Sequence, residues 1–239
     1  AHGHSDVSIL AAPEASGKIS QGVTTEITGN CGLSAFPVLT DEVREHLDNL
    51  YAAYHVPITW STLDDYATEL NRREPAINIA SLCGHNTLRA NISGYGGRTL
   101  AAAELNRMAE LLGQALHQGA AGLSTGLLYT PGRFADTAEL LHLMSVLKKF
   151  DRLYATHLRS EGDQLTEALE EAVFLAKNGS RKLQISHLKT ALPRNWDKLD
   201  RVLELIRNAQ SCGIRLTADR YPYIRSQTSL SVILPPPYD

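Results

Sequence analysis

The sequence predicts an α/β fold, a (β/α)8 barrel of the TIM type that is incomplete because its eighth strand is absent. Amphipathic helical segments alternate with short apolar segments almost throughout the 239 residues, and this alternation predicts βαβ units with a parallel sheet. Polar residues follow nearly every strand-like segment, and a barrel gathers such strand ends around one mouth, whereas an open sheet spreads them along a line. They are Cys31, His85, Ser124, His157, His187 and Asp219.

Each expected element has its own pattern. The strand-like segments are short and rich in apolar or β-branched residues, as in buried parallel strands: 22–28, 76–82, 119–124, 153–157, 183–187 and 214–218. The helical segments repeat apolar residues every three or four positions: 41–55, 61–74, 100–118, 136–150, 163–178 and 196–211. A further strand, cut short, is expected around His2. We expect one partial barrel domain over residues 1–239.

Composition excludes several classes of protein. The chain is 43% hydrophobic and 21% charged, with a net charge of −3, and it has no Lys/Arg run, so we expect no nucleic-acid partner. No apolar stretch reaches the roughly 20 residues of a membrane span, and the N-terminus lacks a signal-peptide layout. Three cysteines are too few for a disulfide framework. These features favour a cytoplasmic protein with reduced thiols and no membrane partner, in which Cys83 and Cys212 pack internally. Oligomeric state is not predicted.

Five residues have the chemistry of metal ligands. His2 and His4 are two apart, so on a strand both imidazoles face one side. Cys31 ends one expected strand, and His157 and His187 end two successive ones. Parallel strands lie about 4.8 Å apart, so these side chains can share a metal, although buried histidines and free cysteines are also common without one. Nitrogen and sulfur donors suit zinc, and zinc would support amide hydrolysis.

Several motifs resemble the D-aminoacylase branch of the amidohydrolase superfamily. They occur in family order, and they are His2-Gly-His4-Ser-Asp, Gly22-Val-Thr-Thr, Gly29-Asn-Cys31-Gly, Gly84-His85-Asn-Thr-Leu-Arg89, Gly122-Leu-Ser-Thr-Gly-Leu-Leu-Tyr129, Thr156-His157-Leu-Arg159, Ile185-Ser-His187-Leu-Lys189 and Asp219-Arg-Tyr221-Pro-Tyr223.

The resemblance implies a zinc enzyme that hydrolyses N-acyl-D-amino acids to a carboxylate and a free D-amino acid. It places Cys31, His157 and His187 at a tightly held metal, with His2 and His4 at a second, weaker position. Lys189 and Tyr221 would bind the substrate carboxylate. On a strand, Lys189 would also point the same way as His187, two residues before it.

The chain departs from the family pattern in three places. The family has a catalytic Asp after the eighth strand, and we assign no residue to that role, Asp239 included. The small β-domain is missing, so we expect an excerpt of a longer protein whose activity in isolation is doubtful. Cyclic amidases of the hydantoinase or dihydroorotase kind resemble one another in a carboxylated lysine after the fourth strand, but no lysine follows the strand 119–124 here, which favours Cys31 as the metal bridge. The segment after Tyr223, Ile-Arg-Ser-Gln-Thr, differs from the small residues of the family.

Three alternatives stay open. One is a cyclic amidase of the hydantoinase or dihydroorotase kind. Another is a serine hydrolase using Ser124, because Gly122-Leu-Ser-Thr-Gly126 fits G-x-S-x-G; the Pro131-Gly132 turn nearby argues against the helix that this motif requires. The third is a metal-free binding or scaffold fragment.

Overall fold

The computed structural model describes residues 2–229 and 232, and within them parallel strands alternate with helices. The strands are β1 (Thr25–Thr28), β2 (Asn78–Ser81), β3 (Cys83–Gly84), β4 (Gly122–Gly126), β5 (Leu153–His157), β6 (Lys182–Ile185) and β7 (Arg215–Ala218). The helices are α1 (Ser8–Ala11), α2 (Ser16–Ile19), α3 (Asp41–Leu50), α4 (Leu63–Arg72), α5 (His85–Ser93), α6 (Ala102–His117), α7 (Thr137–Phe150), α8 (Leu165–Asn178) and α9 (Leu199–Ser211), with 3-10 turns η1 (Ala52–Tyr54), η2 (Gly132–Phe134) and η3 (Pro193–Lys198).

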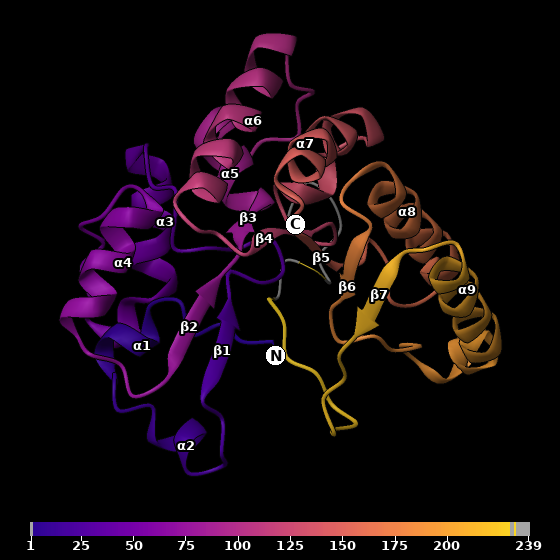
Figure 1. Cartoon of the computed structure of the whole chain (residues 1–239), viewed down its shortest axis with the longest axis horizontal. Coiled ribbons are helices and arrows are strands. Elements are labelled where there is room, and N and C mark those ends of the chain that lie inside the picture. Colours follow the sequence, from indigo (N-terminus) through magenta and orange to yellow (C-terminus); the bar gives the residue numbers. More distant parts are fainter. Residues whose placement is uncertain (1, 230–231, 233–239) are drawn as a thin grey trace.

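The strands form two parallel sheets that follow one another along an arc (Figure 1). One sheet pairs β1 with β2, and the other has the order β3-β4-β5-β6-β7. Only Leu82 separates β2 from β3, and its amide donates to the carbonyl of Thr28 at 2.9 Å. The amide of Ala121 donates to the carbonyl of Ser81 at 2.8 Å, which joins the second sheet to β2. One extended segment therefore links the two sheets.

The described residues do not form a closed barrel. The N-terminal segment lies beside β1, because the amide of Gly3 donates to the carbonyl of Ile27 at 3.0 Å, and β7 is the last strand of the other sheet. What is observed is a parallel α/β arrangement with strand order as expected. Asp239, to which the sequence analysis assigns no catalytic role, lies outside the described residues.

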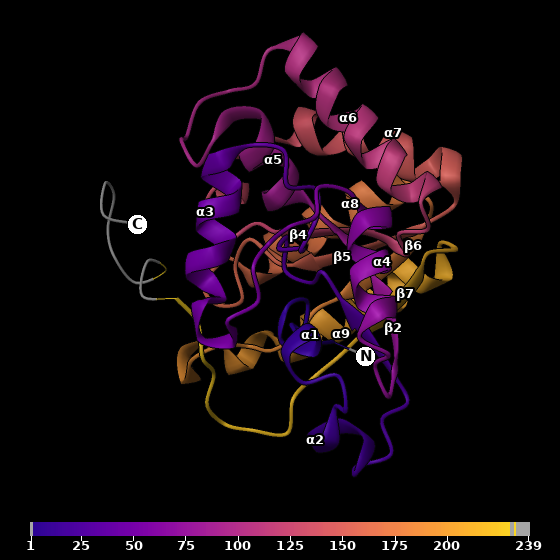
Figure 2. The ribbon, with the colours of Figure 1, turned by 90° about the vertical axis from the view of Figure 1, so that its left-hand side faces the viewer.

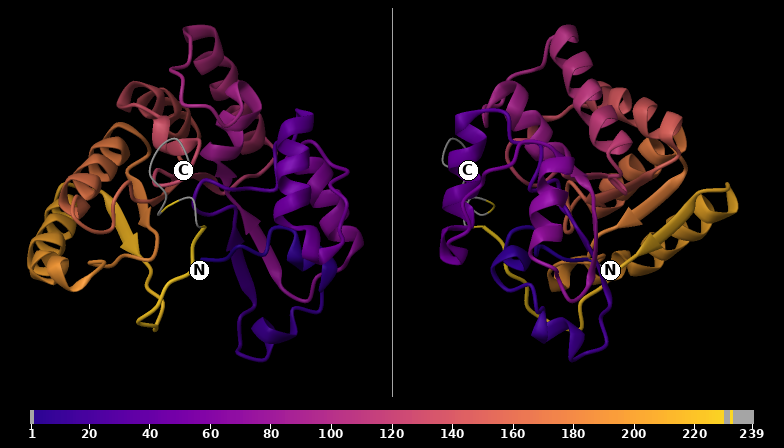
Figure 3. Two further views of the ribbon diagram at one scale, coloured as in Figure 1. Left: turned by 180° about the vertical axis from the view of Figure 1, so that it is seen from behind. Right: turned by 60° about the vertical axis from the view of Figure 1, so that its left-hand side comes forward.

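Helices cover the outer side of the arc, as the views in Figures 1 and 3 agree. Figure 2 shows the side on which α3 and α4 stand in front of the strands. The main core lies between strands and helices, where Leu123 and Ile185 of the strands and Leu112, Leu143 and Leu169 of the helices are fully buried. This packing fixes the strands, so the loops at their C-terminal ends are held in place.

Two helix starts illustrate how local sequence sets these elements. Thr62 caps α4, accepting from the amide of Asp65 while the Asp65 carboxylate accepts from the amide of Thr62, a capping box. Asp136 caps α7 by accepting from the amide of Glu139 at 2.8 Å. Among the described residues no helix has the length and hydropathy to cross a membrane. Cys83 is buried as expected, but the expectation for Cys212 was wrong, since it is exposed.

Candidate metal centre

A short loop after β1 sets the position of Cys31. The backbone of Cys31 is left-handed, with φ of 54°, and the flanking Gly29 and Gly32 also have positive φ. Asn30 donates from Nδ2 to the carbonyls of Ile27 at 2.8 Å and Gly3 at 3.0 Å. The sequence Gly29-Asn-Cys-Gly32 therefore turns the chain sharply and ties the thiol to the N-terminal segment that carries His2.

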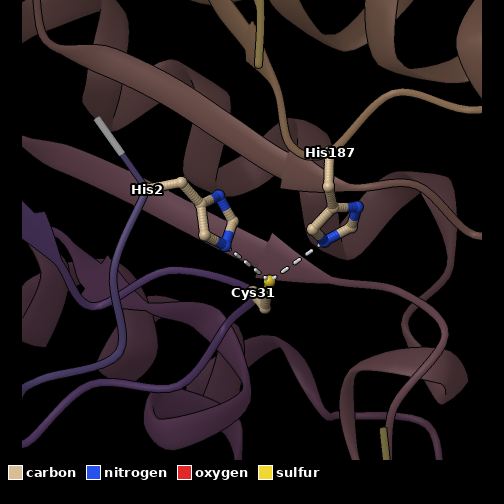
Figure 4. Close-up of side chains that lie close together, drawn as sticks. All are labelled: His2, Cys31 and His187. Carbon is tan, nitrogen blue, oxygen red and sulfur yellow. Dashed lines mark hydrogen bonds between the residues drawn. The ribbon is translucent and has the colours of Figure 1, made fainter. Parts of the chain in front are cut away.

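Two imidazoles converge on the Cys31 thiol (Figure 4). Its Sγ lies 3.6 Å from Nε2 of His2 and 3.5 Å from Nε2 of His187. Ligand atoms around a tetrahedral zinc, with bonds of about 2.1 Å to nitrogen and 2.3 Å to sulfur, are about 3.6 Å apart. The spacing of these three donor atoms therefore fits two edges of a zinc tetrahedron.

His157 closes the site from the end of β5. It is 3% exposed, and neither ring nitrogen has a hydrogen-bond partner among the described residues. Its ring packs edge-on against those of His187 and Tyr129, with centroids 4.4 and 4.6 Å apart. Burial lowers the pKa of His157 to about 3, so the ring is neutral. Buried polar atoms without partners are rare, and a neutral imidazole with a free lone pair is what a metal requires.

Glu161 also belongs to the site, and the sequence analysis missed it. Its Oε1 lies 2.6 Å from Nδ1 of His187 and 2.5 Å from Nζ of Lys189, while its Oε2 is 3.9 Å from Nε2 of His157. Burial alone would raise the pKa of Glu161, but the hydrogen bond to His187 and the charge of Lys189 outweigh burial and lower it to about 2. Glu161 lies in the loop after β5, four residues beyond His157, and no sequence pattern indicated its contact with His187.

In the described part of the chain, two sets of three residues each have donor atoms that all lie within 4.8 Å of one another. They are His2, Cys31 and His187, and His157, Glu161 and His187. His187 is shared, so Cys31 is grouped with His2 rather than with His157, unlike the expected partition. His4 belongs to neither group, although its Nε2 is 3.3 Å from Nε2 of His2. Burial, with the charges of His2 and His187, lowers the pKa of His4 to about 4.

Lys189 and Tyr221 lie together on one side of the site. The Lys189 Nζ is 5.4 Å from the centre of the Tyr221 ring, and it donates to Glu161 and to the carbonyl of His187. The argument that a shared strand aligns Lys189 with His187 was wrong, because β6 ends at Ile185 and His187 has φ of 37°. The two side chains meet instead through Glu161.

A cavity of about 1340 Å³ opens onto these donors. His2, Cys31, His157 and His187 line it on one side, together with Lys189 and Tyr221. Its other lining residues include the mostly apolar side chains of Leu33, Leu50, Tyr95 and Leu128. The cavity thus brings a polar, metal-competent surface and an apolar surface to the same space.

Ser124 does not have the geometry of a serine nucleophile. It is fully buried within β4, and it is not followed by a helix. Its hydroxyl donates to the carbonyl of Gly29 and accepts from the amide of Gly32 at 3.0 Å. Ser124 therefore supports the loop that carries Cys31, and the G-x-S-x-G reading is wrong for this fold.

Known proteins match this chain over nearly its whole length, although no family model matches it. From Alcaligenes xylosoxydans xylosoxydans, N-acyl-D-aspartate deacylase is 36% identical over 230 residues, which are 96% of this chain and 46% of that protein. The D-aminoacylase of the same organism is 34% identical over 231 residues, 96% of this chain and 47% of the relative. The chain thus spans about half the length of these curated relatives.

Solved structures agree. The crystal structure of N-acyl-D-glutamate deacylase from Bordetella bronchiseptica, complexed with zinc and a phosphonate inhibitor, matches with a TM-score of 0.84 and 34% identity, over 93% of this chain and 46% of that one. A D-aminoacylase structure described as defining a novel subset of amidohydrolases matches with a TM-score of 0.84 and 33% identity, over 94% and 46%. The chain is therefore similar, over nearly its whole length, to the N-acyl-D-aspartate and N-acyl-D-glutamate deacylases and to D-aminoacylase.

Proposed function

We propose that the chain is part of a zinc-dependent hydrolase that cleaves the amide bond of N-acyl-D-amino acids. The observation that carries the proposal is the convergence of His2 and His187 on Cys31 at spacings of 3.6 and 3.5 Å, beside a buried His157 with no hydrogen-bond partner among the described residues. The relatives add the substrate class, because they are named for N-acyl-D-aspartate, N-acyl-D-glutamate and D-amino acids.

We also propose that the strands belong to a (β/α)8 barrel in the whole protein. In support, the strands are parallel and follow chain order, with helices outside them. Moreover, Nδ1 of His2, beside the first strand, lies 3.5 Å from Oδ2 of Asp219, directly after the last. Such a contact brings the two ends of the arc to one mouth, where active sites of this fold lie.

In this proposal Cys31, His157 and His187 hold the tightly bound zinc, and His2 and His4 serve a second position. His187 is the residue shared by the two groups of donor atoms in the structure, which are His2, Cys31 and His187, and His157, Glu161 and His187. Zinc at such donors supplies a bound water with a pKa of about 7 and polarises an amide carbonyl. Burial keeps His157 neutral, so its lone pair is available without loss of a proton.

The remaining site residues would orient the substrate. Lys189 and Tyr221 line the cavity next to the donors and offer a cation and a phenol to the substrate carboxylate. Leu33, Leu50 and Tyr95 line it as well, and they would receive an apolar part of the substrate by excluding water from it. The residue that accepts a proton from the attacking water is not assigned.

The test is release of free amino acid from matched D and L substrates by the purified protein. We expect turnover of N-acetyl-D-amino acids, loss of turnover after zinc removal, recovery with added zinc, and no turnover by Cys31→Ala. Opening of hydantoin or dihydroorotate rings in place of acyl release would establish the cyclic amidase instead. Substrate binding without turnover in the zinc-loaded protein would establish a binding module.

A further inference from the structure

We propose that Glu161 and Asp219 are positioning residues that fix the tautomers of His187 and His2, so that both Nε2 lone pairs face the Cys31 sulfur. The inference rests on the proposed metal site and deepens it. Each imidazole has a carboxylate on its Nδ1 side and the thiol on its Nε2 side. Metal-binding histidines usually donate their second ring N–H to such an acceptor.

The contact of Glu161 determines where the proton of His187 lies. Oε1 of Glu161 is 2.6 Å from Nδ1 of His187, a hydrogen-bond distance that requires one proton between the two atoms. The carboxylate is ionised because the ammonium of Lys189 lies 2.5 Å from the same oxygen. The carboxylate therefore favours a proton on Nδ1, which leaves the lone pair of a neutral imidazole on Nε2, the atom 3.5 Å from Cys31 Sγ.

Lys189 is compatible with this tautomer. Its Nζ also lies 3.2 Å from Nδ1 of His187, but a protonated Nδ1 cannot accept a hydrogen bond. The ammonium still donates to Glu161 and to the carbonyl of His187 at 3.1 Å. Lys189 therefore fixes the Glu161 carboxylate, and the carboxylate fixes the ring.

Asp219 occupies the equivalent place behind His2. Its Oδ2 lies 3.5 Å from Nδ1 of His2. That nitrogen has no hydrogen-bond partner among the described residues, so the carboxylate is the acceptor nearest to it. Two hydrogen bonds hold the carboxylate in place, from the backbone amide of His187 at 2.7 Å and from Nε2 of Gln184 at 2.7 Å. Asp219 thus orients the ring of His2 and also supports the left-handed backbone of His187.

The test compares two variants of Glu161 with a matched control. Glu161→Leu removes the acceptor, while Glu161→Gln keeps an acceptor oxygen without charge. Glu171→Leu is the control. Glu171 forms an ion pair with Arg159 at 3.0 Å, as Glu161 does with Lys189, but it has no contact with a histidine of the site. Zinc affinity is measured by competition with a chromophoric chelator, and ring tautomers by nitrogen NMR of metal-free protein labelled only at histidine.

We expect Glu161→Leu to bind zinc about 10- to 100-fold more weakly, Glu161→Gln to lose less, and the control to match the parent. In the parent, His187 and His2 should carry their protons on Nδ1, and Asp219→Leu should abolish this preference at His2. Parent-like zinc affinity in Glu161→Leu, or a proton on Nε2 of His187 in the parent, overturns the inference.

These readouts need no substrate, so they separate the inference from the proposed function. A zinc-loaded parent without turnover refutes the hydrolase but leaves the tautomer result valid. Normal turnover with the wrong tautomer refutes the positioning role alone. If a variant fails to fold, the NMR spectrum of the parent still decides.

Discussion

Replacing Cys31 by Ala should weaken zinc binding at the site and reduce by one the number of protons released when zinc binds. Cys31 is 5% exposed, and its sulfur is the atom on which both His2 and His187 converge. With alanine at this position, the two imidazoles have no sulfur ligand between them. The metal then depends on imidazoles alone.

The size of the effect follows from the energy of a complete site. Structural zinc sites with four ligands bind with roughly 10–16 kcal/mol, so one ligand contributes about 2.5–4 kcal/mol, or a factor of about 100 to 1000 in affinity. Burial raises the pKa of the Cys31 thiol well above its ordinary value. The thiol is therefore protonated at pH 8 without metal, and it must release that proton when it binds zinc.

Calorimetry of zinc binding at pH 8, in buffers of different ionisation enthalpy, measures both quantities. The parent should release about one proton more per zinc than Cys31→Ala. Cys83→Ala is the control, because Cys83 is a buried thiol that lies in neither group of donors. Equal affinity and equal proton release in the parent and Cys31→Ala would refute the assignment of Cys31 as a ligand.

Three further changes test the pocket and the fold. Lys189→Met should raise KM for N-acyl-D-amino acids at least about tenfold, with a smaller change in kcat, whereas Lys182→Met, which breaks an exposed ion pair with an aspartate, should leave both unchanged; an unchanged KM for Lys189→Met would exclude the carboxylate role. Burial raises the pKa of Asp6 to about 7, so its protonated form is favoured in the folded state, and stability is lost as pH rises from 4 to 7. Relative to Asp6→Asn, the parent should lose about 4 kcal/mol of unfolding free energy between pH 4 and 8 in urea titrations; parallel pH profiles would contradict this. Arg89→Met should lower the unfolding free energy by about 3–5 kcal/mol, because fully buried Arg89 pairs with buried Glu139, and a loss below 1 kcal/mol would show that the pair is dispensable.

The spacing of apolar residues predicted the amphipathic helices and the strands, but it did not predict the buried helix α5. Each of the six expected strands overlaps an observed strand, and 153–157 coincides with β5. Each expected helix is present, with ends shifted by a few residues, such as 41–55 against α3 at Asp41–Leu50. Helix α5 was not expected, because His85 to Ala90 are all buried. A helix buried on every side has no alternation of apolar and polar residues to detect.

The site was only partly predictable for a related reason. Residues directly after strands could be placed from the strand pattern alone, which is why His157 and His187 were expected to meet. Glu161 lies in a loop whose path no periodicity describes, so its contact with His187 could not be inferred. Lys189 was expected to lie beside His187 because both would be on one strand. It does line the cavity with His187, but the left-handed backbone at His187 ends the strand alternation, so a shared strand is not the reason.

Hydrogen bonds to the backbone support the loops that carry the donors. Asn30 ties the Cys31 loop to Gly3, next to His2, and Ser124 holds the amide of Gly32. Asp219 holds the amide of His187 from the neighbouring strand end. Because these bonds involve no metal, the strands and loops can place sulfur and nitrogen at zinc-binding distances before zinc arrives. Such preorganisation explains why polar residues without any catalytic chemistry, such as Asn30 and Ser124, lie within the motifs that surround the ligands.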